Sequence, residues 1–288
     1  MKAILYISGF LFIIGIFCTG CGSGKPVVTA SPYEEKVTDS VQKSPVSMEA
    51  GEEITESPSV PIPPEKDSIQ TNRIVDLHEK WDSLLQKHVK PNGFVSYEGF
   101  KKDRKKLEEY LSGLSHNVPD TSATKNEKLA YWINVYNAFT IELILDHYPV
   151  ASIKDIKNPW DEEFFKLGGT AYSLNDVEHK ILRTMKEPRI HFAIVCASVS
   201  CPKLLNEAFR PEQLETQLEM ATKHFLNNPE KNKIAENNLE LSLIFRWFSK
   251  DFKSFGAIES FIQPYVDVTI TARPKISYLK YDWGLNGR

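Results

Sequence analysis

The chain has 288 residues, and 35 Lys and Arg against 38 Asp and Glu give it a formal net charge of -3. Because no cluster of basic residues stands out, nucleic acid is not expected as a partner. Of the four cysteines, two fall within the first 21 residues, which leaves Cys196 and Cys201 for the rest of the chain.

The first 21 residues have the layout of a targeting segment. A lysine precedes an apolar run that ends at Phe17, and small residues lead into Cys21. The run is too short for a comfortable membrane span and predicts a signal peptide. Its end resembles the lipobox of bacterial lipoproteins, which implies lipidation of Cys21 and a membrane anchor in the bacterial cell envelope. Gly22 and Ser23 after the anchor imply the outer membrane. The alternative is an ordinary secretory signal, with Cys21 left as a free thiol.

Residues 22–72 are rich in Pro, Ser, Glu, Val and Thr and show no sustained apolar period. Such a segment cannot bury enough surface to offset its ordering entropy, so it predicts a disordered tether. Residues 73–288 are then expected to form one globular domain.

Apolar residues at helical spacing predict two amphipathic helices, over about 73–90 and 97–114. A third helix is expected from Thr124, where Thr124 and Glu127 have capping-box spacing, to just before Pro149. It is apolar almost all the way round, which places it at the centre of the fold.

Tyr131, Asn134 and Asn137 follow one another at intervals of three along this central helix and form a polar stripe. Buried amides need hydrogen-bond partners. Two interpretations remain open: the stripe pins neighbouring loops, or it lines a ligand pocket.

After this helix, a strand, a Gly168–Gly169 turn and a second strand lead into a helix capped by Ser173. Glu178 falls on the apolar face of that helix. A carboxyl group there needs a partner and often has a perturbed pKa. One interpretation is that Glu178 anchors the core through an arginine such as Arg189, and that the neighbouring His179 is a surface residue.

The segment 189–198 is continuously apolar and predicts a buried strand. A helix with Pro211 in its first turn, a hairpin around Asn237–Asn238 and a short helix near Ile258 are expected to follow. The order predicts an α+β fold, with a central buried helix and peripheral helices packed on a small, mostly antiparallel sheet.

Several segments together resemble one family. They are, in chain order, AYWINVYNAFTI, LNDVEHKILR, HFAIVCASVSCPKL, LSLIFRWFSKDF and YDWGLN. This pattern is similar to the DUF547 domain, a family of uncharacterised proteins, over nearly all of residues 73–288. The resemblance implies one α+β domain and signature positions at Asn134, Tyr136, Asn137, Glu178, His179, His191, Cys196 and Asp282.

Cys196 and Cys201 lie five positions apart. In an oxidising compartment this spacing is compatible with a disulfide. The alternative to a disulfide is a reactive thiol at Cys196. The domain has a distant fold-level likeness to papain-like or transglutaminase-like thiol hydrolases, but those enzymes place their cysteine at the start of the central helix, where this chain has WINVYNA. On a regular strand His191 points away from Cys196, so His179, with Glu178 as orienter or acid, is the expected base. Two cysteines and one histidine fall short of a zinc site, and no motif predicts a cofactor.

Two functions are therefore carried forward. The first is a surface-anchored binding or scaffold domain for a peptide, glycan or small molecule, with Asn134, Asn137, Tyr131 and His191 as candidate ligand-binding residues. The second is a thiol-dependent hydrolase or acyl transferase that acts on a peptide, amide or envelope polymer through Cys196, His179 and Glu178. Three tryptophans could line a glycan or peptide groove, although aromatic residues in such surroundings are more often core: Trp132, Trp247 and Trp283.

Overall fold

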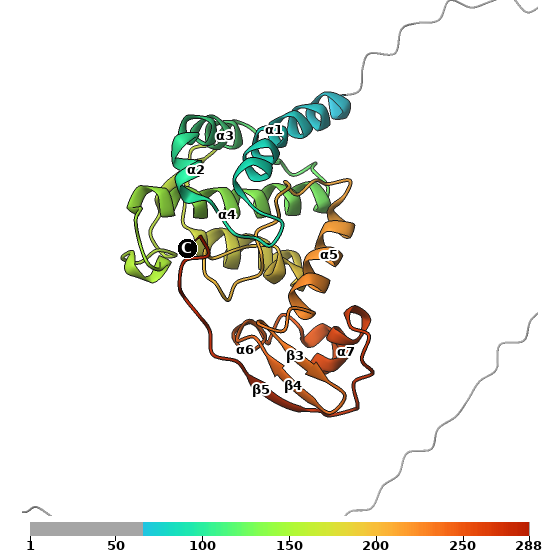
Figure 1. Cartoon of the computed structure of the whole chain (residues 1–288). Coiled ribbons are helices and arrows are strands. Elements are labelled where there is room, and N and C mark those ends of the chain that lie inside the picture. The colour runs from blue at the N-terminus through green and yellow to red at the C-terminus, as the bar shows by residue number, and fades with distance from the viewer. Residues whose placement is uncertain (1–65, 288) are drawn as a thin grey trace, which may run out of the picture. The chain divides into compact units, whose positions relative to one another are not determined.

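The structure, a computed structural model, describes residues 66–287 (Figure 1). The predicted signal peptide, Cys21 and residues 22–65 of the predicted tether lie outside the described residues. The prediction of a lipid anchor is therefore untested by the structure. None of the helices within residues 66–287 has the length and apolar character that a membrane-spanning segment needs.

The described residues form an α+β fold, as the sequence predicts. The α-helices are α1 (Lys66–His88), α2 (Tyr97–Lys102), α3 (Arg104–His116), α4 (Lys125–His147), α5 (Leu214–Leu226), α6 (Ile244–Trp247) and α7 (Ile258–Ile262). Short 3-10 helices are η1 (Ile153–Asp155), η3 (Arg183–Met185), η4 (Pro188–Phe192), η5 (Lys253–Phe255) and η6 (Gln263–Tyr265), and η2 (Asp176–Leu182) is a π-helix. The strands are β1 (Phe165–Leu167), β2 (Thr170–Tyr172), β3 (Lys233–Ala235), β4 (Asn238–Leu241) and β5 (Lys275–Tyr278).

Helix α4 is the central element. Its predicted capping box is present, because Thr124 Oγ1 accepts from the Glu127 N–H at 3.2 Å and the Glu127 carboxylate accepts from the Thr124 N–H at 2.6 Å. Every residue from Leu129 to Ile141 is buried. Helices α2 and α3 pack on α4 from one side and η2 from another (Figure 1). The prediction of a buried central helix is confirmed.

The helix expected over 97–114 is broken at Asp103, which separates α2 from α3. The Asp103 carboxylate accepts from Lys87 Nζ at 2.6 Å and lies 2.7 Å from His88 Nε2 at the end of α1. The break thus occurs where Asp103 contacts helix α1. The spacing of apolar residues within 97–114 carries no information about such a contact.

The buried strand expected over 189–198 is wrong. Residues Pro188–Phe192 form η4, and the chain continues without regular structure through Cys196. The segment is buried, as expected, but an apolar run alone does not distinguish a strand from other buried backbone. The Asn137 side chain bonds Ala193 O at 3.0 Å and the Val195 N–H at 2.9 Å, so a side chain of α4 takes the place of a neighbouring strand.

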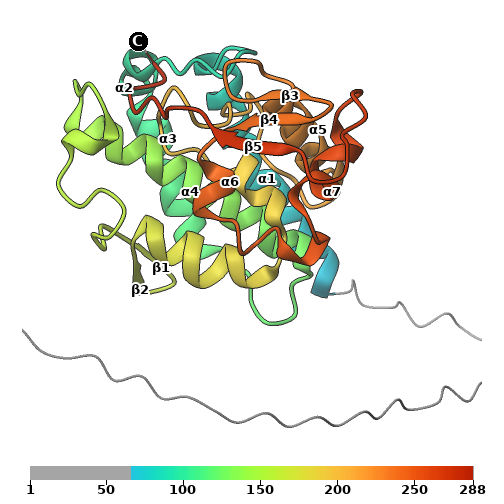
Figure 2. The ribbon, with the colours of Figure 1, turned by 90° about the horizontal axis from the view of Figure 1, so that it is seen from below.

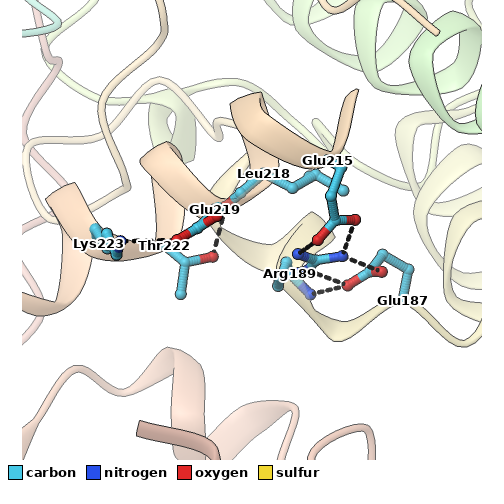
Figure 3. A network of polar contacts seen from close by, with 7 residues as sticks. All are labelled: Glu187, Arg189, Glu215, Leu218, Glu219, Thr222 and Lys223. Carbon is cyan, nitrogen blue, oxygen red and sulfur yellow. Dashed lines mark hydrogen bonds and ion pairs between the residues drawn. The ribbon is translucent and has the colours of Figure 1, made fainter. Parts of the chain in front are cut away.

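An arginine fixes η4 to α5. Figure 3 shows Arg189 between two carboxylates, Glu187 beside it in sequence and Glu215 in the first turn of α5. Its guanidinium donates to Glu215 Oε1 at 2.6 Å and to Glu187 Oε1 at 2.8 Å. The suggested pairing of Arg189 with Glu178 is therefore wrong.

Pro211 was expected in the first turn of the next helix but precedes it, because α5 begins at Leu214.

Two small sheets complete the fold. Strands β1 and β2 form the predicted antiparallel hairpin, with Gly168 and Gly169 at positive φ in its turn. Strands β3 and β4 form the second hairpin, and β5 adds to β4 in parallel (Figure 2). On β4, Leu239 and Leu241 point into an aromatic-rich core shared with α5, α6 and α7.

Candidate functional site

A pocket of about 200 Å³ lies where α4, η2, the segment after η4, α6 and the C-terminal tail meet. It brings together three candidate catalytic residues of the sequence analysis, Glu178, His179 and Cys196, and one candidate ligand-binding residue, His191. We refer to it as the aromatic pocket, because tryptophan and tyrosine side chains supply much of its wall. Those that bear on the argument are Tyr136, Trp160, Trp247, Tyr281 and Trp283.

Glu178 is held in this pocket by the π-helix η2. The predicted Ser173 cap is present, with the Asp176 N–H donating to Ser173 Oγ at 3.1 Å. The Arg183 N–H donates to Glu178 O, which gives the wider turn of a π-helix, a feature that often occurs at functional sites. The Glu178 side chain lines the pocket, and the residue is only 7% exposed.

Burial determines the chemistry of the Glu178 carboxyl group. Burial raises its pKa to about 7, against the opposing charge of Arg183 and a hydrogen bond from Tyr136. That bond is long, with Tyr136 Oη 3.4 Å from Glu178 Oε2. Burial also raises the pKa of Tyr136 well above its usual value, so its hydroxyl remains a donor. Near neutral pH Glu178 can therefore either accept or donate a hydrogen bond.

His191 belongs to a network that sequence reasoning missed. Its Nε2 lies 2.8 Å from Asp251 Oδ2, and its ring stacks on Phe248 with centroids 3.9 Å apart. Arg183 donates to both Asp251 oxygens, at 2.6 and 2.8 Å. Burial would raise the pKa of Asp251, but the hydrogen bonds from His191 and Arg183 hold it below its usual range. Burial lowers the pKa of His191, so the neutral ring predominates.

His179 is less suited to act as a base than predicted. It is exposed, and its Nδ1 lies 2.8 Å from Arg183 Nη1, where a neutral ring accepts from the guanidinium. Partial burial and the charge of Arg183 lower its pKa. His179 and His191 thus flank the same arginine, and His191 alone bonds a carboxylate.

Cys196 and Cys201 are joined in a disulfide, with Cα atoms 6.3 Å apart. Tyr281 Oη lies 3.4 Å from Cys196 Sγ and 3.2 Å from Cys201 Sγ. Between the cysteines, Ala197 has a φ of 57°, a left-handed conformation that is uncommon for a residue with a side chain. In this form Cys196 is not a thiol, so the pocket contains no cysteine nucleophile.

The C-terminal tail holds the disulfide loop in place. The Val199 N–H donates to Gly284 O at 2.7 Å, and the Ser200 N–H donates to Asp282 O at 3.1 Å. Asp282 Oδ1 accepts from the Gly284 N–H at 2.8 Å. Asp282 therefore shapes the tail that carries Tyr281 and Trp283 into the pocket.

Three tryptophans form an aromatic wall of the pocket. Trp283 lies 5.6 Å from Trp160 and 5.7 Å from Trp247, measured between ring centroids. Trp247 is 46% exposed, which is unusual for so large an apolar side chain. Trp132 lies elsewhere, buried against Tyr131 and Tyr172.

The polar stripe of α4 bonds the protein's own backbone. Tyr131 Oη donates to Leu114 O at 2.7 Å, and Asn134 bonds both Phe209 O, at 2.8 Å, and the Phe209 N–H, at 3.0 Å. Asn137 holds the segment that leads to Cys196, as described above. Asn134 and Asn137 thus hold neighbouring loop segments, the first of the two interpretations, whereas Tyr131 bonds the last turn of helix α3.

Sequence reasoning did not single out Asp251, Trp160 or Tyr281. Asp251 lies within the segment LSLIFRWFSKDF, residues 241–252, so this motif was a signal for it. In the described part of the chain, no group of three or more His, Cys, Asp and Glu side chains is placed to hold a metal ion.

A comparison with protein families gives one match. The family described as "Protein of unknown function, DUF547" matches residues 121–226. A DUF547 domain is thus detected within residues 121–226. The match is shorter than the expected 73–288. It includes α4, η2, the disulfide and α5, whereas Trp247, Asp251 and Trp283 come from the chain beyond it. No curated protein and no solved structure matches the chain.

Proposed function

We propose that this protein is a lipoprotein of the bacterial cell envelope, anchored in the outer membrane through Cys21, and that its DUF547 domain binds a sugar unit of a glycan in the aromatic pocket. The observation that carries the proposal is the combination of one exposed indole ring, that of Trp247, with the buried carboxyl group of Glu178. Ligand pockets are characteristically apolar, with a few polar groups that fix orientation. Trp247 offers a flat apolar face with the Trp283 ring stacked beside it, and Glu178 and Tyr136 offer hydrogen bonds.

The charges around the pocket favour a neutral ligand over a cationic one. Lys154 Nζ lies 5.2 Å from the centroid of the Trp283 ring, and the Arg183 guanidinium lies 5.3 Å from that of Phe248. These cations already lie over aromatic faces that a cationic ligand would use. Arg183 would also repel a cation that approached Glu178. Sugar hydroxyl groups, in contrast, can both donate to and accept from Glu178.

Titration of the full-length chain with neutral oligosaccharides tests this function. We would follow tryptophan fluorescence with cellotriose, maltotriose and tri-N-acetylchitotriose. For whichever sugar binds, Trp247→Ala should weaken binding roughly ten-fold or more, as expected for an aromatic side chain at the centre of a contact. Phe255→Ala is the matched control, because Phe255 is similarly exposed, at 48%, and does not line the pocket. Absence of saturable binding for all three sugars, or equal losses in both variants, would count against the proposal.

A second candidate function rests on a different observation. His191 and Cys196 line the same pocket, and Asp251 orients His191, which is the base-and-orienter half of a thiol catalytic arrangement. A neutral His191 that donates from Nε2 to Asp251 keeps Nδ1 as the acceptor. If a dithiol reductant opened the disulfide, Cys196 would become available for acyl transfer from a peptide or amide, with His191 rather than His179 as base.

Thiol labelling separates the two functions. Cys201→Ser leaves Cys196 as a free thiol, whose alkylation rate is then measured against pH. An apparent pKa well below about 8.5, the ordinary thiol value, and its return toward that value in Cys201→Ser/His191→Gln would support the thiol enzyme. An ordinary apparent pKa for the Cys196 thiol in both variants would contradict the thiol enzyme. The binding function would then be the remaining proposal.

A further inference from the structure

A second, larger cleft lies on the other side of the disulfide loop. Its volume is about 430 Å³, and it shares Cys201 and Pro202 with the aromatic pocket. The turn at 91–94, the end of α5, the turn at 228–231 and the tail around Asn286 form the rest of its wall. We call it the lysine cleft. Among the described residues, none of the site residues predicted from the sequence lines it, although Cys201, the disulfide partner of Cys196, does.

Two half-buried lysines are the charged groups that distinguish this cleft. Lys203 Nζ donates to Pro91 O at 3.2 Å, and Lys231 Nζ donates to Val199 O. Among the described residues, both ammonium groups are thus held by main-chain carbonyl oxygens, and neither forms an ion pair of the kind that holds Arg189 or Arg183. Partial burial lowers the pKa of both lysines, while the more distant charges of Glu207, for Lys203, and of Glu230 and Asp282, for Lys231, oppose this shift. Partly desolvated cations that no carboxylate contacts in an ion pair favour an anionic ligand.

Neutral polar groups around the lysines can also donate. Asn92 Oδ1 accepts from the Phe94 N–H at 3.1 Å, and Asn228 Oδ1 accepts from the Glu230 N–H at 2.9 Å. Because their oxygens are engaged, the amide nitrogens of these two side chains are the groups left to donate. His224 also lines the cleft, and its pKa is lowered by burial and by Lys203. Glu230 is the acid of the lining, and it is exposed to solvent.

The position of Lys203 is fixed by a close backbone approach. Gly93 has a φ of 85°, and a Cβ atom added to it would lie 2.3 Å from Lys203 Cβ. Only glycine permits this approach. The base of the Lys203 side chain is therefore held against the 91–94 turn, which keeps its ammonium group at the cleft and reduces the ordering needed to bind a ligand.

We propose that the lysine cleft binds the phosphate group of a ligand. Lysine acts as a point charge toward phosphate, whereas a planar carboxylate is matched best by the forked guanidinium of arginine, which the cleft does not contain. Two ammonium groups and the amides of Asn92 and Asn228 complement a dianion with several oxygens. This inference is independent of sugar binding in the aromatic pocket, since different side chains carry it.

Calorimetric titration of the full-length chain with inorganic phosphate, at constant ionic strength, tests the proposal. We expect saturable binding at one site. Lys203→Gln and Lys231→Gln should each weaken it at least about ten-fold, equivalent to about 1.4 kcal/mol. Lys166→Gln is the matched control: Lys166 is an exposed lysine on β1, so this variant makes the same charge change away from the cleft and should bind within about two-fold of the parent.

Several results would overturn this assignment: no saturable binding, equal losses in Lys166→Gln, or binding of acetate as tight as that of phosphate. Unfolding midpoints are recorded for each variant, and Lys231→Gln keeps the test decisive if Lys203→Gln does not fold, because Lys231 does not pack on Gly93. Glycerol 1-phosphate is titrated in parallel. If glycerol 1-phosphate binds more tightly than inorganic phosphate, the cleft is assigned to a phosphorylated organic ligand. If the two bind equally, it is assigned to free phosphate.

Discussion

Replacing Glu178 with glutamine should make the protein more stable at alkaline pH. Glu178 is 7% exposed, and the hydrogen bond from Tyr136 to its carboxyl group is long at 3.4 Å. Glutamine has nearly the same shape and can accept that bond. It carries no proton that must be released from a buried site, so the variant isolates the cost of ionising residue 178.

The sign follows from the direction of the pKa shift. The ordinary glutamate value of 4.5 applies in the unfolded chain, and burial raises the value in the folded protein to about 7. The folded state therefore holds this proton more tightly, so its stabilising contribution is complete below pH 4.5 and is lost as pH rises through about 7. Arg183, which favours the ionised form, and Asp251, which opposes it, are already included in this shift.

The full shift corresponds to about 3 kcal/mol, of which about 2.5 kcal/mol falls between about pH 5 and pH 8. The assay is urea unfolding of the parent, of Glu178→Gln and of the exposed control Glu162→Gln at these two pH values. The stability of Glu178→Gln relative to the parent should rise by about this amount from the lower to the higher pH. Parallel pH dependences for all three proteins would refute the reasoning, because they would mean that Glu178 ionises as easily in the folded state as in the unfolded state.

Three further predictions concern the groups around the pocket. Asn137→Ala should lower the free energy of unfolding in urea by about 2 to 4 kcal/mol, since it leaves Ala193 O and the Val195 N–H buried without their partner. Asn237→Ala, in the exposed β3–β4 turn, is its control. An equal loss in the control would contradict the loop-pinning role of Asn137. Asp251→Asn should cost about 1 to 3 kcal/mol at neutral pH, because Arg183 loses its carboxylate. Because the pKa of Asp251 is lowered in the folded protein, the difference in unfolding free energy between the parent and Asp251→Asn should shrink as the solution is acidified. A difference that persists in acid would contradict this prediction. Cys201→Ser should cost about 2 kcal/mol under oxidising conditions, as expected for a short disulfide loop, and a much smaller loss would indicate that Cys196 and Cys201 are not bridged in the protein as purified.

The sequence alone determined the elements whose causes are local. The spacing of Thr124 and Glu127 predicted the start of α4, and the apolar residues on nearly all sides of the helix predicted its burial. Both signals depend on residues within one helix. The glycine pair at Gly168–Gly169 predicted the first hairpin for the same reason, since positive φ at a turn is a property of the residues in it. Glu178 was recognised from its place on an apolar helix face. The signal peptide and the lipid anchor at Cys21 are also sequence inferences, and they remain predictions.

Only the tertiary structure decided which side chains share the pocket. The apolar run 189–198 is compatible with a strand, in which His191 and Cys196 would face apart. Asn137 binds its backbone instead, and the two residues line one pocket. Asp251, which bonds His191, lies 60 positions from it in sequence. Arg189 donates to Glu187 and Glu215 and not to Glu178. Such contacts depend on how separate elements pack, and the periodicity of a single segment carries no information about its partners.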